Sequence, residues 1–176
     1  PWVDAVFAHS AREAMVAKGF EPGPDWSAAP LRIGETWLLL CDQETRDGMA
    51  ARLRYTDDKA ARPSWSADAR VHADRALREL GAAICRSGRR FTTVPCPERF
   101  EVSVACPRDL RVRDDSLGTA VCAAALSSQL QRAPRQNVAA TARVMSDGVL
   151  GSVECLDKKL EALAARWPGV DTVVVA

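Results

Sequence analysis

The chain has 176 residues, of which 47% are hydrophobic and 27% are charged, a composition that suits one globular domain with a real core. The 24 Lys and Arg residues nearly balance the 23 Asp and Glu residues, which leaves a formal net charge of +1. This balance gives no electrostatic reason to expect a nucleic acid or a membrane as a partner. We also expect neither a membrane span nor a signal peptide, and therefore a cytoplasmic location.

The first third of the chain predicts a helix, a loop and a pair of strands. Apolar residues at helical spacing predict a helix over 3–18, and the prolines and glycines of 21–34 predict an irregular connection. The apolar run 36–41 predicts a strand, and the alternating segment 51–56 predicts its partner. The polar segment 57–66, which contains a proline, is expected to be a loop.

The middle of the chain predicts one long helix and one strand. The helix is expected over 67–86, capped by Ser66 or Asp68. Its inward-facing residues are expected to be Val71, Ala76, Leu80 and Ile84. The alternating segment 100–105 predicts a strand.

The last third predicts helices that alternate with strands. Helices are expected over 116–131 and 156–167, each followed by a proline. Strands are expected over 138–145 and 170–175, and the segment 148–153 is expected to form a turn and a short strand.

The fold class is therefore α/β or α+β, with mixed sheets and packed helices. A single domain is expected over 1–176, with 1–35 as a candidate N-terminal extension. The strand that closes the chain suggests that this domain is part of a longer protein.

The six cysteines do not predict a metal site. They form no C-x-x-C pair, and only two histidines accompany them, so a zinc site is not expected. Most of them lie in apolar runs, which favours buried thiols in a reducing compartment. They are Cys41, Cys85, Cys96, Cys106, Cys122 and Cys155.

Ser116 is a candidate nucleophile because it lies in a polar turn, Asp114–Gly118, at the start of a predicted helix. A serine in this position most often caps the helix. However, the unpaired N–H groups of a helix N-terminus can also stabilise an oxyanion beside a serine, and Gly118 would let a substrate backbone approach. Asp115 could then act as the cap in place of Ser116.

Lys159 is the candidate base. The predicted helix 156–167 has one apolar stripe, which consists of Leu156, Leu160, Leu163 and Trp167. Lys159 lies at the edge of this stripe, whereas Lys158 points to the opposite, solvated side. Lys159 is therefore expected either to extend its amine to solvent or to be half buried, as a lysine base must be. Thr141 is either an ordinary strand residue or the residue whose hydroxyl holds the lysine amine.

These residues occur in an order that resembles the proteolytic domain of the Lon protease family, over roughly the second half of the chain. The segment 101–104 and the turn 115–118 are similar to the strand and nucleophile turn of the family. The segments 137–141, 148–160 and 164–175 are similar to its threonine strand, its lysine helix, and its closing helix and strand.

The match runs without a gap from Ser116 to Lys159, and two short stretches depart from it. Where the family has Gly-Pro before the serine and Ala after it, this chain has Asp114-Asp115 and Leu117. Where the family has Gly-Gly-Leu-Lys-Glu-Lys, this chain has the residues 154–159, Glu-Cys-Leu-Asp-Lys-Lys.

The resemblance implies a serine endopeptidase in which Ser116 is the nucleophile, Lys159 is its general base and Thr141 orients the lysine. It implies a protein or peptide substrate and no cofactor. The chain contains no Walker A motif, so ATP-independent activity is expected, with a fused or separate activator in a signalling or defence protein. Two alternatives stay open, a catalytically silent Lon-like binding or assembly module and a self-processing protease of a polyprotein.

Overall fold

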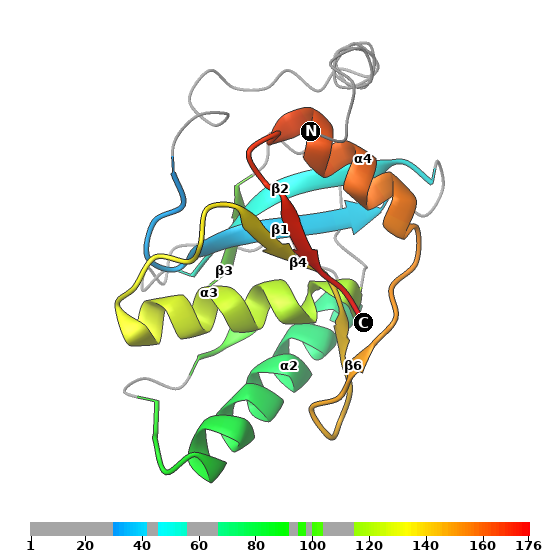
Figure 1. Cartoon of the computed structure of the whole chain (residues 1–176). Coiled ribbons are helices and arrows are strands. Elements are labelled where there is room, and N and C mark those ends of the chain that lie inside the picture. The colour runs from blue at the N-terminus through cyan, green and yellow to red at the C-terminus, as the bar shows by residue number, and fades with distance from the viewer. Residues whose placement is uncertain (1–29, 42–45, 56–66, 92–94, 98–99, 104–114) are drawn as a thin grey trace.

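The computed structural model describes residues 30–41, 46–55, 67–91, 95–97, 100–103 and 115–176 of the chain. The predicted helix at 3–18 and the predicted loop at 57–66 lie outside these residues, as does most of the candidate extension 1–35. The described residues form an α+β arrangement of helices and small sheets (Figure 1). Among these residues, no helix is long and apolar enough to cross a membrane.

The centre of the fold is an antiparallel sheet of three strands in the order β1-β2-β3. These strands are β1 (Glu35–Cys41), β2 (Gly48–Tyr55) and β3 (Phe100–Ser103). The predicted strand pair is confirmed, although β2 begins three residues earlier than the alternating segment suggested. Pairing extends from Glu35 opposite Arg54 to Cys41 opposite Gly48, which joins β1 to β2 along the full length of β1.

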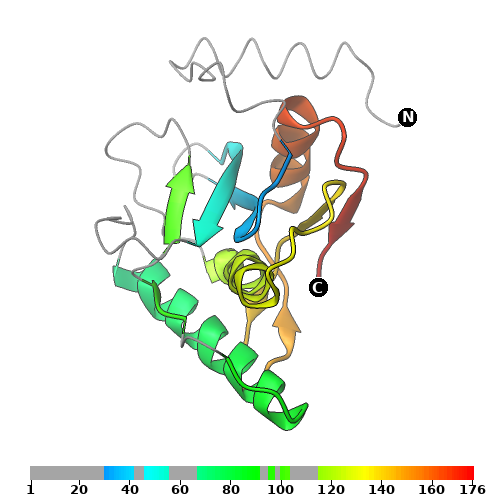
Figure 2. The same cartoon turned by 90° about the vertical axis from the view of Figure 1, so that its left-hand side faces the viewer.

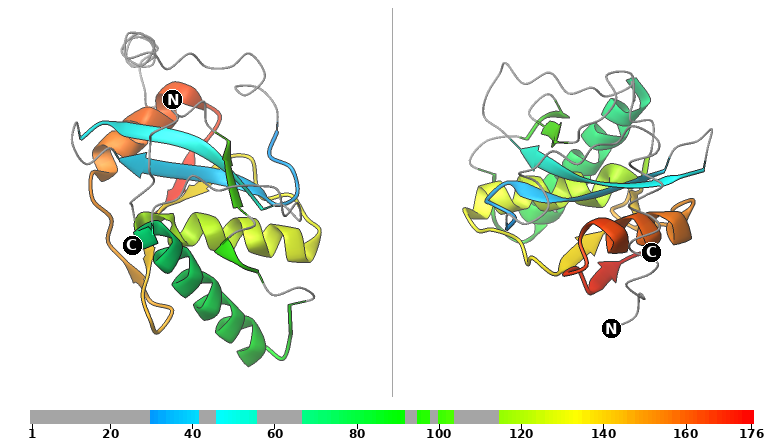
Figure 3. Two further views of the ribbon diagram at one scale, coloured as in Figure 1. Left: turned by 180° about the vertical axis from the view of Figure 1, so that it is seen from behind. Right: turned by 90° about the horizontal axis from the view of Figure 1, so that it is seen from above.

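Both faces of this sheet are covered. Successive residues of β1 place their side chains on opposite faces, so that each face of β1 packs in a different core. Leu38 and Leu40 belong to a core that includes residues of α2 (Ala67–Arg86) and α3 (Gly118–Leu130). Trp37 and Leu39 belong to a second core, with residues of α4 (Leu156–Arg166). Figure 3 shows the sheet between α4 on one side and α2 and α3 on the other. A strand that is buried on both faces reads as a continuous apolar run, which explains the sequence of β1.

Helix α2 has the predicted bounds but buries a different face. Its buried residues are Ala69, Ala73, Ala76 and Leu77. Val71, which was expected to face inward, is 54% exposed, while Ala76 is buried and Leu80 packs at the edge of the core. The buried face of α2 therefore consists of three alanines and one larger apolar residue, Leu77. Figure 2 shows α3 end-on, with α2 below it and α4 above it.

The predicted strand over 138–145 is two short strands in different sheets. Strand β4 (Val138–Ala140) pairs in parallel with the closing strand β7 (Thr172–Val174). Strand β5 (Arg143–Val144) pairs in an antiparallel manner with β6 (Leu150–Gly151). The break falls at Thr141 and Ala142, so one of the candidate site residues lies between two sheets.

Two tryptophans hold the C-terminal end of α4 against the central sheet. The ring centroids of Trp37 and Trp167 are 4.4 Å apart, and Trp167 follows the last residue of α4. The Arg52 guanidinium lies 5.0 Å from the centroid of the Trp37 ring and pairs with Glu35 at 3.6 Å. Burial lowers the pKa of Arg52, and the Glu35 carboxylate opposes that effect.

Candidate active site

Ser116 lies in a single turn of 3-10 helix, Asp115–Leu117, that leads directly into α3. The residue at the N-cap of α3 is Leu117, which makes no side-chain hydrogen bond there. Ser116 is therefore not the capping residue of this helix, which removes the most common structural reason for a serine in this position. The side chain of Ser116 is only 1% exposed.

Lys159 lies in the first turn of α4 and is fully buried, with an exposed fraction of 0%. The buried face of α4 is rotated about the helix axis relative to the predicted apolar stripe. Lys159, Ala162 and Leu163 form the buried face, and Leu160 is 37% exposed. Lys159 therefore occupies the middle of the contact face rather than its edge, and it does not extend its amine to solvent.

The structure brings Ser116 and Lys159 together although they are 43 positions apart in the chain. Lys159 Nζ donates a hydrogen bond to Ser116 Oγ at 2.7 Å, and this bond is buried. A nucleophile and its base must lie about 2.6–3.2 Å apart for proton transfer. The geometry of the pair therefore meets the first requirement for a Ser–Lys dyad.

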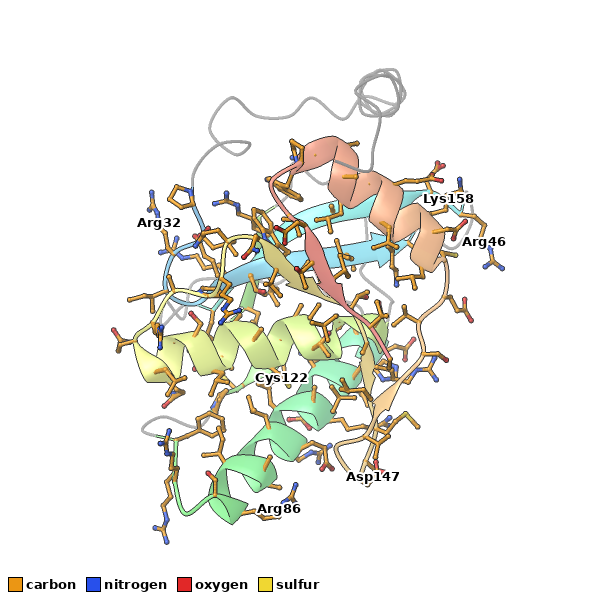
Figure 4. The ribbon with its side chains drawn as sticks, viewed as in Figure 1. Arg32, Arg46, Arg86, Cys122, Asp147 and Lys158 are labelled. Carbon is orange, nitrogen blue, oxygen red and sulfur yellow. The ribbon has the colours of Figure 1, made fainter. Side chains whose placement is uncertain are left out.

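The neighbouring lysine has the opposite environment. Lys158 is exposed and donates a hydrogen bond to Glu161 Oε2 at 2.9 Å. This hydrogen bond, and the charge of Glu161, raise the pKa of Lys158. Lys158 thus stays cationic and solvated, as the sequence predicted, and Figure 4 shows it beside Arg46 at the start of α4.

Hydrogen bonds place Thr141 beside the last residue of β7 and its neighbour Ala142 beside the first turn of α3. Thr141 N donates to Val174 O at 3.0 Å. The next residue, Ala142, is held reciprocally by the first turn of α3, because its N–H donates to Thr119 Oγ1 at 3.0 Å and its carbonyl accepts from Thr119 N at 3.4 Å. Thr119 was not among the predicted site residues, although its position in the first turn of a predicted helix was an available signal.

The Thr141 hydroxyl is buried, but within the described part of the chain its Oγ1 forms no hydrogen bond. The predicted hydrogen bond from this hydroxyl to the lysine amine is therefore not formed in the structure. A buried hydroxyl without a partner lowers stability, so its presence here needs a reason other than packing.

Thr141→Val is expected to raise the free energy of unfolding by about 1 kcal/mol, because valine has a similar shape and no unpaired hydroxyl. The matched control is Thr119→Val, which removes the acceptor of the Ala142 N–H and should lower the free energy of unfolding by about 1 kcal/mol. Urea denaturation of both variants measures the two changes. A loss of stability in Thr141→Val equal to that in Thr119→Val would show that the Thr141 hydroxyl is paired.

Gly118 has a different role from the one expected. A Cβ atom at this position would lie 2.9 Å from Val144 Cγ2 and 3.1 Å from Val144 N. The space beside Gly118 is therefore filled by β5 rather than open to a substrate backbone. The glycine instead allows the first turn of α3 to pack directly against this strand.

Gly48 is a second residue that sequence reasoning missed, and it positions the lysine helix. A Cβ atom here would lie 1.9 Å from Lys158 O and 2.8 Å from Lys159 N. The first turn of α4 thus packs against the bare backbone at the start of β2. Because of this close approach, Lys159 lies in the interior of the protein.

Gly48→Ala is expected to lower the free energy of unfolding by about 3 kcal/mol, since backbone atoms cannot move aside as a side chain can. The control is Gly169→Ala, because nothing lies within 4 Å of a Cβ built at Gly169. Thermal unfolding of both variants gives the comparison. Equal stability of the two variants would contradict the close packing of α4 on β2.

The cysteines are less buried than the sequence suggested. Cys85 is exposed, and Cys41, Cys96, Cys122 and Cys155 are partly exposed. None of these five is in a disulfide, and Cys106 lies outside the described residues. Among the described residues, no group of three or more His, Cys, Asp and Glu side chains could hold a metal ion.

No protein-family model matches the chain, and the search of curated proteins finds no match. The chemistry of the site therefore has to be inferred from its own geometry.

Proposed function

We propose that the chain is a Lon-like serine endopeptidase that works without ATP and uses Ser116 and Lys159 as its catalytic dyad. The observation that supports this proposal is the buried 2.7 Å hydrogen bond between Lys159 Nζ and Ser116 Oγ. Serine and lysine are the minimum equipment for nucleophilic attack on a peptide carbonyl, and both residues were candidates on sequence grounds alone.

The burial of the pair also supports a chemical role. A lysine at the centre of a helix contact face costs stability unless it is well paired, because burying an amine removes its hydration. An apolar residue such as leucine or methionine would fill the same position without that cost. The chain instead has Lys159 at this position, and the amine of this lysine is hydrogen-bonded to the Ser116 hydroxyl.

The reaction follows from the positions of these groups. With the amine neutral, the Ser116 hydroxyl donates its hydrogen to Lys159 Nζ, and Oγ attacks the peptide carbonyl carbon as the proton moves to the amine. The lysine then returns the proton to the leaving amine, and water hydrolyses the acyl-enzyme by the same route. The partial positive charge at the start of α3, two residues after Ser116, would favour the oxyanion.

The order of the described elements supports the Lon-like part of the proposal. A strand, the serine turn, an alanine-rich helix, the short strand before Thr141, the lysine helix and a closing strand occur in this order from β3 to β7. This is the order expected from the resemblance. The substrate in this proposal is a protein or peptide, and a fused or separate module would deliver or activate it.

The test exposes the complete chain to a library of unstructured peptides, with new peptide ends identified by mass spectrometry. A fluorophosphonate probe, which forms a covalent bond with an activated serine, is applied in parallel and its site is mapped. We expect new peptide ends and labelling of Ser116. Ser87 is the internal control, because it is exposed and its hydroxyl only donates to Ile84 O. Natively folded protein that yields neither new ends nor label at Ser116 would argue against the proposal.

One observation favours a second candidate function, a catalytically silent binding module. Ser116 and Lys159 are both almost completely buried, so their hydrogen bond could hold α3 and α4 together as a structural pair. In that case Ser116→Ala would reduce stability and change nothing else. The peptide library and the probe separate this candidate from the protease.

A further inference from the structure

Two cysteines from distant parts of the chain meet beside the first turn of α4. Cys41 is the last residue of β1, and Cys155 immediately precedes α4. The side chains of the two cysteines are hydrogen-bonded to each other. The backbone gives the same placement independently, because Cys41 is paired with Gly48 and Gly48 packs against the backbone of Lys158 and Lys159.

The surroundings of Cys155 favour a thiolate. Arg46 Nη1 donates a hydrogen bond to Cys155 Sγ at 3.6 Å. The hydrogen bond with Cys41 and then the one from Arg46 lower the pKa of Cys155, and the Glu154 carboxylate opposes them. Cys155 is also at the N-terminal end of an 11-residue helix, where partial positive charge stabilises an anion. Figure 4 shows Arg46 at this end of α4.

The two thiols also have the access and freedom that oxidation requires. Neither is in a disulfide and both are partly exposed, so a small oxidant can reach them. A low-pKa, accessible thiol beside a second thiol is the arrangement of a redox-sensitive pair.

We propose that Cys155 is a site of oxidation by hydroperoxides and that Cys41 resolves the oxidised sulfur into a Cys41–Cys155 disulfide. In the first step the Cys155 thiolate attacks a peroxide oxygen, the O–O bond breaks and hydroxide leaves, which oxidises the sulfur to a sulfenic acid and reduces the peroxide. In the second step Cys41 sulfur attacks Cys155 sulfur, the S–S bond forms, and the S–O bond breaks. The proton of Cys41 goes to the departing hydroxide as water.

Such a disulfide would act on the helix that carries the candidate base. Lys159 N donates to Cys155 O at 3.0 Å, so the oxidised cysteine would lie one hydrogen bond from the lysine backbone. A bond to β1 would fix the start of α4 against the central sheet. An effect on peptide cleavage would rest on the proposed function, whereas the disulfide itself does not depend on it.

The experiment treats the reduced, complete chain with hydrogen peroxide, blocks the remaining thiols and maps the peptides by mass spectrometry. It is done in the Ser116→Ala background, so that its outcome is independent of protease activity. We expect a Cys41–Cys155 cross-linked peptide that a dithiol reductant removes. In Cys41→Ser, a sulfenic acid should persist at Cys155 and be trapped by dimedone, and in Cys155→Ser, Cys41 should stay reduced.

A matched pair of variants tests whether the positive charge of Arg46 promotes the oxidation of Cys155. Arg46→Gln should slow the oxidation of Cys155 several-fold, because it removes a hydrogen bond and a positive charge from the thiolate. Arg86→Gln, which changes an exposed arginine at the end of α2, should leave the rate unchanged. Cys122 should react slowest of the described cysteines, because burial raises its pKa to about 12.

Three results would overturn the proposal. They are oxidation of Cys155 no faster than that of the exposed Cys85, a disulfide that joins a different pair, and equal rates in Arg46→Gln and the parent chain. Circular dichroism of each variant before oxidation shows whether its fold is intact, and thermal unfolding of the oxidised and reduced protein reports the cross-link independently. An unchanged melting temperature with the cross-link fully formed would contradict its action on α4.

Discussion

Ser116→Ala is expected to abolish peptide-bond cleavage, with kcat/KM lowered by about 10⁴-fold or more. The reason is chemical, because alanine has no oxygen that can attack a carbonyl. The free energy of unfolding should also fall, by about 1–3 kcal/mol, since the substitution removes the Ser116 hydroxyl to which the buried Lys159 amine donates. Initial rates on a peptide that the parent chain cleaves, together with urea denaturation, measure both effects.

The control for this substitution is Ser87→Ala, which also removes a hydroxyl but from an exposed serine in the turn that follows α2. Its cleavage rate should equal that of the parent chain. If Ser116→Ala still cleaved the peptide at the parent rate, the nucleophile would have to be another residue, and the proposed dyad would be wrong.

Lys159→Met is expected to remove cleavage as completely as Ser116→Ala while keeping the fold. Methionine has a similar length and no base, so the serine keeps its place but loses its proton acceptor. Replacing a buried amine by an apolar side chain should leave the free energy of unfolding unchanged or raise it. Lys159→Ala should also be inactive but less stable by about 2–5 kcal/mol, because it leaves a cavity in the contact face of α4.

Two controls separate chemistry from packing in these variants. Lys158→Met changes the exposed neighbour and should alter neither the cleavage rate nor the stability measurably. The double variant Ser116→Ala with Lys159→Met should be no less active than either single variant, because residues that act as one unit are not additive. An additional large loss in the double variant, or activity in Lys159→Met near that of the parent chain, would show that Lys159 is not the base.

Much of the secondary structure could be predicted because it depends on neighbours along the chain. The pattern of apolar residues located α2 and α4 and the strand pair β1–β2 to within a few residues. The predicted bounds of elements were wrong where pairing with a strand distant in the sequence determines where a strand begins and ends. A continuous β-type segment at 138–145 is divided between two sheets because β7 pairs with its first half and β6 with its second.

The candidate pair shows the same division between local and distant effects. The sequence identified Ser116 and Lys159 as the serine and lysine to consider, from a polar turn before a helix and from a lysine beside an apolar stripe. It placed Lys159 at the edge of that stripe. The structure places it at the centre, because α4 packs on β2 at Gly48, where the absence of a side chain lets the helix approach the backbone.

The sequence alone thus determined the order of the helices and strands and the residue types available for chemistry, since both follow from local spacing. Tertiary structure decided which face of α4 is buried, that Gly118 receives Val144 rather than a substrate, and that Cys41 meets Cys155. The physical reason is that burial and contact are properties of two surfaces. A periodic pattern defines only one of them, and chain folding supplies the other from residues far away in the sequence.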